Sequence, residues 1–425
     1  MDKSRSILRE NSRKLILFTS DFPFGSGETF LENEVPYLSR AFEQVVLVPT
    51  EQVNGDPRAI PENMAIEVPN FPFERLGKVS MLKQLFHPDF LHELFRIVFV
   101  YRLLPTPKRV KTALVSLFRG KQITLWLQQI GVEPSRTVLY SYWCNDAAIG
   151  ISLFKRKNPS VRAVTRSHGW DLYFEASTIG YLPYRSLITT QFDMVCPVSE
   201  AGVKYIFEKW KCNRTTNIQL ARLGVEAQTP PNALPDVFTV VSCSNLIPLK
   251  RVHLIIEALS KINDIPLKWV HFGDGPLSTE LYDLAERILP PNISWKFMGH
   301  IPNQELLQWY RENPVSVFIN VSETEGIPVS IMEAMSFGIP VIATNVGGTG
   351  EIVREVFDGM LVSAEGSHTE VSEVLIRLSK LSSNELIKVT MTLKNSWTEN
   401  CNAKMNYISF TDMLLNLGNF TPVNL

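Results

Sequence analysis

The sequence lacks the features that mark secreted, disulfide-bonded or membrane-spanning proteins. It contains 425 residues but only five cysteines, and none of them forms a CxxC pair. Cysteines scattered in this way argue against a disulfide framework and against a zinc site. The first residues are polar and lack the apolar core of a signal peptide, and no apolar run reaches the roughly 18 residues that cross a bilayer. We therefore expect a reduced, cytoplasmic protein.

Charge of one sign is also missing. The chain has 42 Lys and Arg against 43 Asp and Glu, and its net charge is −1. No global field therefore draws it to nucleic acid, and we expect no nucleic-acid partner. No D-x-D pair occurs, so the usual carboxylate motif for a metal-bridged diphosphate is absent and we expect no metal site.

What is present is enough apolar sequence for a large core. Hydrophobic residues make up 45% of the chain and charged residues 20%, which is typical of a folded globular protein. The length predicts two or three domains.

The most informative stretch runs from Val315 to Val353. An apolar run of strand length, 315–321, leads into a polar turn, and Pro328 suits the first position of a helix. A second strand and a glycine loop, 345–350, follow. Strand, helix, strand and loop predict one unit of a parallel α/β sheet, with both loops at the carboxyl edge where ligands bind.

Two carboxylates and a helix start complete this predicted site. Glu325 lies in the turn and Glu333 lies in the helix. The N–H groups and dipole of a helix start favour an anion such as phosphate by about 0.3–1 kcal/mol. A carboxylate only accepts hydrogen bonds, so each glutamate suits the hydroxyls of a ribose or a sugar.

The stretch from Glu325 to Glu333 resembles the paired-glutamate signature, E-x7-E, of retaining glycosyltransferases of family 4. This resemblance implies the GT-B fold, in which two Rossmann-like, doubly wound α/β domains face each other across a cleft. It implies that Glu325 contacts the donor sugar and that Glu333 holds the ribose. The residues expected to surround the donor between them are Gly326, Ile327, Pro328 and Val329.

Earlier loops match the family less closely. Lys250 matches the lysine that neutralises the donor diphosphate, but Asn245 stands where an arginine is expected. Arg251 could supply the lost charge from a different direction. His168 follows an expected strand, 161–166, and resembles the family histidine that contacts the transferred sugar; a lone histidine is otherwise more often structural.

Four glycines are further candidates. Gly273 and Gly299 follow expected strands and resemble loops that flank the nucleotide. Gly25 and Gly27 follow the first strand and resemble a loop near the donor phosphates and the acceptor. An ordinary βα turn explains Gly25 and Gly27 equally well, and with the third glycine of a dinucleotide fingerprint missing, NAD binding is weakly indicated.

The expected organisation is an acceptor-binding domain at 1–224, a donor-binding domain at 225–395 and a C-terminal helix at 396–425 that packs back on the first domain. Residues 75–121 are rich in Lys and Arg and interleaved with apolar clusters. Such a helical region could rest on an anionic membrane or bind a lipid-linked acceptor. It could also pack on its own domain with solvated lysines, which amphipathic helices do more often.

The resemblance implies retaining transfer of a hexose-type sugar from a UDP- or GDP-linked donor to an acceptor hydroxyl. We expect no cofactor and no metal requirement. The expected acceptor is a sugar or lipid-linked sugar in cell-surface polysaccharide or glycolipid biosynthesis, with peripheral contact to the inner face of the membrane. The alternatives are a non-catalytic sugar-nucleotide-binding subunit and a sugar-nucleotide epimerase or hydrolase of the same fold.

Overall fold

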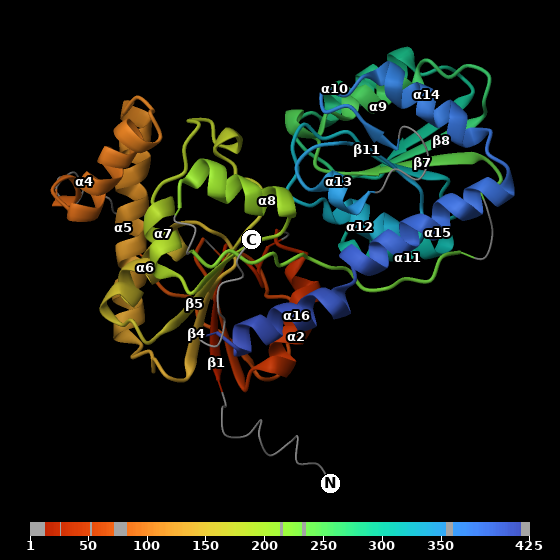
Figure 1. The fold of residues 1–425 in the computed structure, drawn as a ribbon. Coiled ribbons are helices and arrows are strands. Elements are labelled where there is room, and N and C mark those ends of the chain that lie inside the picture. Colours follow the sequence, from red (N-terminus) through yellow and green to blue (C-terminus); the bar gives the residue numbers. More distant parts are fainter. Residues whose placement is uncertain are drawn as a thin grey trace, which may run out of the picture. The chain divides into compact units, whose positions relative to one another are not determined.

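A computed structural model shows two α/β units, each built on a six-stranded parallel sheet (Figure 1). The first unit comprises Met1–Ala221 with Tyr407–Leu425, and the second comprises Arg222–Asn406. The two expected Rossmann-like domains are thereby confirmed. The structure describes residues 13–25, 27–51, 53–71, 83–212, 216–231, 235–353 and 360–417.

The sheet of the first unit has the order β3-β2-β1-β4-β5-β6. Every neighbouring pair is parallel. The chain starts in the middle at β1, moves outward to β3, and returns to the other side of β1 with β4. The switch point of the sheet therefore lies between the carboxyl ends of β1 and β4. The strands are β1 (Lys14–Thr19), β2 (Gln44–Pro49), β3 (Met64–Ile66), β4 (Thr137–Ser141), β5 (Arg162–Ser167) and β6 (Met194–Pro197).

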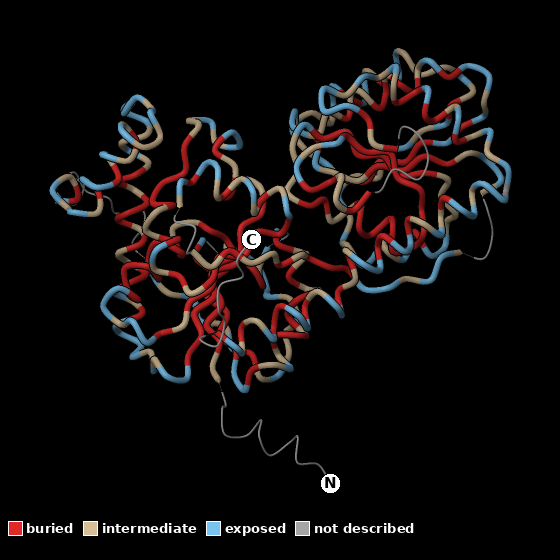
Figure 2. Tube along the Cα trace, in the orientation of Figure 1, coloured by how far each residue is buried: buried red, intermediate tan, exposed pale blue. Residues whose placement is uncertain are grey.

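Helices cover both faces of this sheet, as alternate side chains of β1 show. Ile16 and Phe18 belong to a buried cluster with α5 (Pro107–Gln129), α6 (Asp146–Lys157) and α7 (Arg185–Gln191). Leu15 and Leu17 point to the other face, into a cluster with α2 (Leu31–Ala41) and α16 (Ala403–Leu415). Figure 2 shows the strands as the buried centre of the unit. Strands buried on both faces are apolar along their whole length, which is why the sequence predicts them well.

Residues 75–121 were expected to be helical. The structure has α4 (Pro88–Phe95), a π-helical turn (Arg96–Val100) and α5, which extends beyond the expected range to Gln129. Residues 72–82 lie outside the described part of the chain. The remaining helices of the unit are 3-10 turn Phe174–Ala176, α8 (Glu200–Tyr205) and π-helical turn Ile206–Trp210.

The second unit repeats the same topology. Its sheet has the order β12-β11-β10-β7-β8-β9, so its switch point lies between β7 and β10. The strands are β7 (Phe238–Cys243), β8 (Leu267–Phe272), β9 (Ile293–Phe297), β10 (Val317–Asn320), β11 (Val341–Thr344) and β12 (Leu361–Val362). The helices are 3-10 turn Pro248–Lys250, α9 (Val252–Leu259), α10 (Ser278–Ile288), α11 (Asn303–Glu312), α12 (Val329–Ser336), α13 (Thr349–Ile352), α14 (His368–Ser379) and α15 (Ser383–Asn400).

The helices of this unit also form two layers. Helices α9, α10 and α14 share one buried apolar cluster with the sheet, and α11, α12 and α15 lie on the other face (Figure 1). The carboxyl ends of β7 and β10 are thus held between two packed layers, and the loops that leave them start from fixed positions.

Some details differ from the expectations. Pro328 is the N-cap of α12, which begins at Val329, so the proline lies one position before the predicted first turn. The expected C-terminal helix corresponds to α16, whose residues from Tyr407 onward belong to the first unit. The sequence predicts that Trp397 and Phe410 anchor this last helix. Phe410 does so in the first unit, whereas Trp397 is buried in the second unit. Among the described residues, none of the helices has the length and apolar character needed to span a bilayer.

Candidate active site

Two loops meet at the switch point of the second unit, one from β7 and one from β10. The ammonium of Lys250, after β7, donates to Glu325 Oε1 at 2.6 Å, and both side chains are mostly buried. Asn320, the last residue of β10, donates through Nδ2 to the same oxygen at 3.4 Å. The sheet therefore brings together a cation and a carboxylate that lie 75 residues apart.

The glycine loop after β11 supports the backbone of Glu325. Gly347 has φ of +54°, and a Cβ there would lie 1.7 Å from the Glu325 carbonyl oxygen, so only glycine fits. The N–H of Gly348 donates to Gly326 O at 2.8 Å, and Thr344 Oγ1 donates to Ser322 O at 2.6 Å. The two loops that the sequence placed at one edge thus form a single packed structure.

Helix α12 starts at Val329, four residues after Glu325. Among the described residues, the N–H groups of Gly326, Ile327, Val329 and Ser330 donate to no backbone or side-chain acceptor. Together with the helix dipole, these groups form a positive end that suits a phosphate. Lys250 adds a full charge beside it.

Glu333 lies one and a half turns into α12 and is 6% exposed. Its Oε1 accepts a hydrogen bond of 2.7 Å from Asn303 Nδ2, at the start of α11. Burial raises the pKa of Glu333 to about 7, and the bond from Asn303 offsets only part of this effect. The carboxyl group is therefore poised to ionise near neutral pH, and two hydroxyl donors from a ribose would stabilise its charged form.

This burial predicts a pH effect on stability. Between pH 4.5 and about pH 7, Glu333 is ionised in the unfolded chain but protonated in the folded one, so stability falls as the pH rises through this window. The total loss should be about 3 kcal/mol. Urea unfolding at pH 5 and pH 8 should show this loss in the wild type and not in Glu333→Gln. The exposed Glu305 of α11 offers the control Glu305→Gln, and a pH dependence unchanged in Glu333→Gln would contradict the assignment.

At the switch point of the first unit, a buried glutamate organises the loop after β1. Glu28 accepts hydrogen bonds from the N–H groups of Ser20, Asp21 and Phe22 at 3.0, 2.9 and 2.8 Å. The indole N–H of Trp143, after β4, also donates to it. Burial raises the pKa of Glu28, while these four donors act in the opposite direction. The loop N–H groups that could cradle a phosphate are thus used by the protein itself.

A second carboxylate positions His168. Asp171 is fully buried and accepts from the N–H groups of Cys144 and His168, both at 2.8 Å. His168 Nδ1 lies 3.7 Å from Asp171 Oδ2, beyond a normal hydrogen bond, and neither ring nitrogen has a partner among the described residues. Burial lowers the pKa of His168, so its imidazole is neutral at pH 7. A buried ring with two free nitrogens is suited to bind a hydroxyl.

Aromatic rings surround this histidine. Tyr142 stacks on His168 at 4.7 Å, and Trp143 lies 4.5 Å away. Trp170 lies 5.1 Å from Trp143 and is 50% exposed, so one large aromatic surface faces solvent beside the histidine. Aromatic faces with a few polar groups between them are common in binding sites for small molecules.

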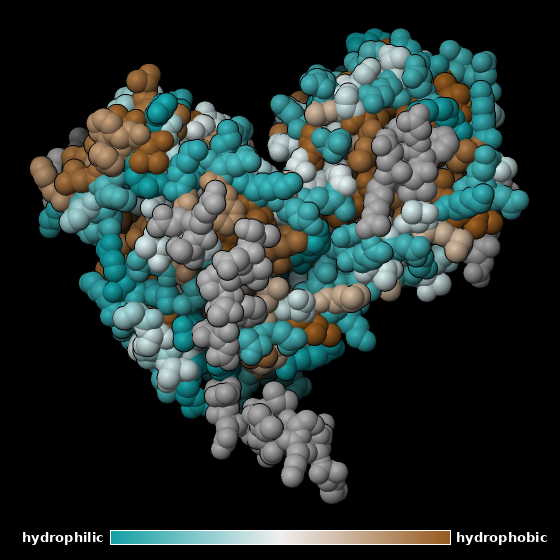
Figure 3. All heavy atoms as spheres, in the orientation of Figure 1, coloured by the Kyte–Doolittle hydropathy of each residue, from teal (hydrophilic) through white to brown (hydrophobic). Residues whose placement is uncertain are grey.

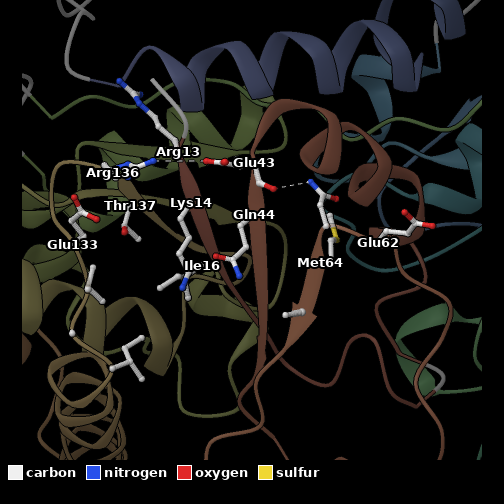
Figure 4. A pocket seen from close by; sticks show the side chains of 15 residues that line it. Arg13, Lys14, Ile16, Glu43, Gln44, Glu62, Met64, Glu133, Arg136 and Thr137 are labelled. Atoms are coloured by element: carbon white, nitrogen blue, oxygen red, sulfur yellow. Dashed lines mark hydrogen bonds and ion pairs between the residues drawn. The ribbon is translucent and has the colours of Figure 1, made fainter. Parts of the chain in front are cut away.

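A hollow of about 670 Å³ in the first unit lies at the opposite edge of the sheet. Figure 4 shows that its lining comes from the start of β1, β2 and β4, with Lys14, Gln44 and Thr137 at the strand ends. These are amino ends, whereas ligands of parallel sheets bind at carboxyl ends. We therefore place no site there.

Residues 226–393 match the family model described as "Glycosyl transferases group 1". The match covers most of the second unit, which is therefore similar to group 1 glycosyltransferases. Lys250, Glu325 and Glu333 all lie within the matched residues.

Individual proteins agree with this result. The chain is 26% identical over 290 residues to the putative colanic acid biosynthesis glycosyltransferase WcaL of Escherichia coli, covering 62% of this chain and 70% of WcaL. It is 22% identical over 386 residues to the amylovoran biosynthesis glycosyltransferase AmsK of Erwinia amylovora, covering 86% and 91%.

Solved structures confirm the GT-B fold. Anabaena HepE in complex with UDP and glucose superimposes with a TM-score of 0.64 at 14% identity, covering 95% of this chain and 99% of HepE. TarM superimposes with a TM-score of 0.65 at 12% identity, covering 95% and 99%.

Within the second unit, Arg251 does not present its charge to a ligand. Its guanidinium donates to the carbonyl oxygens of Val321, Ser322, Ala364 and Glu365, at 2.6–3.0 Å. It therefore braces the loop after β10 against the segment after β12. The suggestion that Arg251 replaces the arginine missing at Asn245 finds no support in this geometry. Asn245 itself is exposed at the β7 loop.

Gly273 and Gly299 lie together, because the Gly273 N–H donates to Gly299 O at 2.9 Å. A Cβ on Gly273 would lie 2.0 Å from Ser244 O, so close packing of the β7 and β8 loops already requires this glycine. A Cβ on Gly299 would meet nothing within 4 Å. The φ of +71° at Gly299 favours glycine by itself, so the contact of either glycine with a nucleotide stays a prediction.

In the first unit, Gly25 and Gly27 both face the carboxylate of Asp21. A Cβ would lie 2.7 Å from it at Gly25 and 3.1 Å at Gly27. The carbonyl oxygens of both glycines accept hydrogen bonds from Arg58. The φ of +61° at Gly25 favours glycine without any phosphate, whereas at Gly27 the Asp21 side chain alone is close. The role of both glycines in binding an acceptor or phosphate stays a prediction.

The sequence reasoning missed the residues that position the candidate site. Asn320 falls within the expected strand 315–321, and Asn303 lies four residues after Gly299. Glu28 directly follows Gly27 and has no predicted role. A polar residue at a strand end or helix start was the available signal in each case. Among the described residues, no three His, Cys, Asp or Glu side chains cluster closely enough to hold a metal ion.

Proposed function

We propose that the protein is a retaining glycosyltransferase that moves a hexose from a nucleoside diphosphate donor to an acceptor hydroxyl. The observation that carries the proposal is the ion pair between Lys250 and Glu325 beside the unpaired N–H groups that open α12. A cation and a helix start suit a diphosphate, and the two glutamates suit hydroxyls. The matched family supports sugar transfer as the reaction class.

In the proposed reaction, the glycosidic bond to the diphosphate breaks and negative charge develops on the leaving phosphate. Lys250 and the first turn of α12 stabilise that charge. Because these groups belong to the protein, we propose transfer without a metal ion. The leaving phosphate oxygen takes the proton of the acceptor hydroxyl, and the new bond forms on the same face of the sugar, so configuration is kept.

We propose the remaining roles from the resemblance to family 4 glycosyltransferases. Glu325 binds hydroxyls of the transferred sugar and Glu333 binds the ribose of a UDP- or GDP-linked donor. His168, with both ring nitrogens free, binds a hydroxyl of the sugar, and Trp170 offers an aromatic face to the acceptor. The similarity to WcaL and AmsK supports a role in cell-surface polysaccharide biosynthesis, with a sugar or lipid-linked acceptor at the inner face of the membrane.

Nucleotide-induced thermal stabilisation tests the donor site. UDP, GDP, ADP and NAD are each added to the wild type, and a ligand at 100 times its Kd should add about 2.7 kcal/mol of stability. We expect UDP or GDP to stabilise the wild type, Glu333→Ala to lose the shift, and the control Glu305→Ala to keep it. Stabilisation by NAD alone, or equal shifts in Glu333→Ala, would refute the assignment. NMR of the product then distinguishes retention from inversion, and binding without turnover would indicate a non-catalytic subunit.

A further inference from the structure

The helical segment from α4 through the following π-helical turn is apolar on two opposite sides. Its inner side packs into the core of the first unit, where Phe90 is 2% exposed and Ile97 is fully buried. Its outer side carries Leu91, Phe95 and Phe99, which are 51, 53 and 68% exposed. A helix on the surface of a domain normally has a polar outer side. The exposed apolar side of this segment therefore indicates a binding surface for another molecule.

The outer residues form one surface. Leu91, Phe95 and Phe99 follow each other at helical spacing, and the rings of Phe95 and Phe99 are 4.9 Å apart. Phe86 and Leu104, which flank the helical segment, are 78 and 76% exposed. Figure 3 shows hydrophobic atoms gathered at the end of the unit that carries α4. We call these five residues the apolar tip.

The charge around the apolar tip is positive. Arg102, Lys108 and Lys111 are exposed and form no ion pair with a carboxylate among the described residues. The first turn of α5, which contains Lys108 and Arg109, has no acidic residue, although acids are favoured at that position. An anion from outside the chain would supply the negative charge that this helix start lacks.

Neither acidic residue of α4 offsets this charge. Asp89 forms two hydrogen bonds with Arg156, at 2.6 and 2.8 Å. Glu93 is 1% exposed and accepts from Tyr181 Oη and from the Tyr184 N–H, at 2.5 and 2.9 Å. Both carboxylates are thus satisfied inside the unit, and no negative charge of α4 would repel an anionic surface.

We propose that the apolar tip inserts into the surface of a membrane that contains anionic phospholipids, with Arg102, Lys108 and Lys111 at the level of the headgroups. Exposed aromatic side chains that lie beside Lys and Arg bind such membrane interfaces. The burial of apolar surface and the attraction to anionic headgroups act together. The other reading of residues 75–121, packing on their own domain, applies to the inner side of this segment. The inner side packs on the first unit, and the outer side faces the membrane. The inference rests on the proposed membrane-borne acceptor but not on the chemistry of transfer.

Co-sedimentation of the full chain with vesicles tests this surface. Vesicles of phosphatidylcholine alone are compared with vesicles containing phosphatidylglycerol, and we expect binding to the anionic vesicles. Each base near an anionic surface contributes about fivefold, so Lys108→Ala/Lys111→Ala should lower the partition coefficient about 25-fold. Phe95→Ser/Phe99→Ser should lower it by at least a factor of about 10.

Helix α15 of the other unit offers matched controls, since Ile387 and Met391 are 55 and 61% exposed and Lys388 and Lys394 are exposed too. Ile387→Ser/Met391→Ser and Lys388→Ala/Lys394→Ala should bind vesicles as the wild type does. Equal loss in these controls, or a wild type that stays in the supernatant, overturns the proposal. A dimer that Phe95→Ser/Phe99→Ser converts to a monomer without vesicle binding would instead assign the apolar tip to a second copy of the chain.

Activity is read separately on a water-soluble acceptor. There Phe95→Ser/Phe99→Ser should keep the wild-type kcat, since the apolar tip takes no part in the chemistry. Vesicle binding by a chain without any transfer activity would refute the proposed function. The proposal that the apolar tip binds membranes would still hold.

Discussion

Lys250→Met is expected to reduce kcat by a factor of about 10²–10³, which corresponds to about 2.7–4 kcal/mol of lost transition-state stabilisation. The Lys250 ammonium lies 2.6 Å from Glu325 at the switch point, beside the unpaired N–H groups of α12. Its charge is most valuable when the leaving diphosphate becomes more negative, so the loss should appear in kcat more than in KM. Steady-state kinetics with saturating donor measure this directly.

The matched control is Lys268→Met, because Lys268 is exposed on β8 and forms no ion pair among the described residues. This control should keep wild-type kcat. Glu325→Ala should also abolish transfer while the chain unfolds at nearly the wild-type temperature, since Glu325 lies in a loop and not in the core. A Lys250→Met enzyme with unchanged kcat would show that the diphosphate is neutralised elsewhere.

Glu34→Ala is expected to destabilise the protein by about 3–5 kcal/mol. Glu34 of α2 forms an ion pair with Arg166 of β5, and neither side chain is exposed to solvent. Tyr140 Oη donates to Glu34 Oε1 at 3.1 Å, and the Arg166 guanidinium lies 4.0 Å from the centre of the Phe410 ring of α16. Removing the carboxylate leaves the positive charge of Arg166 buried without a negative partner, and this lowers the free energy of unfolding. Urea unfolding of the full chain measures the change.

Two further variants separate the ion pair from simple loss of packing. Glu34→Leu/Arg166→Met removes both charges and should recover most of the lost stability, because apolar side chains of similar volume replace buried ion pairs at little cost. Glu32→Ala, on the same helix, removes a partly exposed pair with Arg58 and should cost about 0–1 kcal/mol. A Glu34→Ala protein as stable as Glu32→Ala would contradict the buried-pair assignment.

The central strands could be read from the sequence with small errors. The sequence alone predicts buried strands at the apolar runs 14–20, 45–49, 137–141 and 268–272. The strands β1, β2, β4 and β8 coincide with these runs to within one residue at either end. Strands of a parallel sheet are covered on both faces, so they are continuously apolar and visible locally. The short edge strands β3 and β12 were not predicted. They are 3 and 2 residues long, and only pairing with a neighbouring strand defines them.

In the candidate site, too, some residues can be interpreted from the sequence alone and others only from the tertiary structure. Glu325 and Glu333 stand on one short segment, so their spacing and the helix between them could be recognised without any distant contact. Arg251 could not be interpreted from its neighbours, because its role depends on four carbonyl oxygens in two remote loops. Asn303 could not be connected with Glu333 for the same reason.

The apolar tip shows most clearly what could not be predicted from the sequence. Phe90 and Phe95 look alike in the sequence, yet one is 2% and the other 53% exposed. A helix with apolar residues on two opposite sides gives no local signal for the side that meets the core, so the packing of α4 against its own unit decides it.

The sequence by itself therefore determined the parallel α/β character of the chain and the spacing of Glu325 and Glu333 on one loop and helix, because both depend on near neighbours along the chain. Tertiary structure alone decided which charges meet and which apolar residues stay exposed. The pairing of Lys250 with Glu325, the bracing role of Arg251 and the exposed side of α4 arise from packing between segments that are distant in sequence. Such packing is set by the energy of the whole fold and leaves no periodicity in any single stretch.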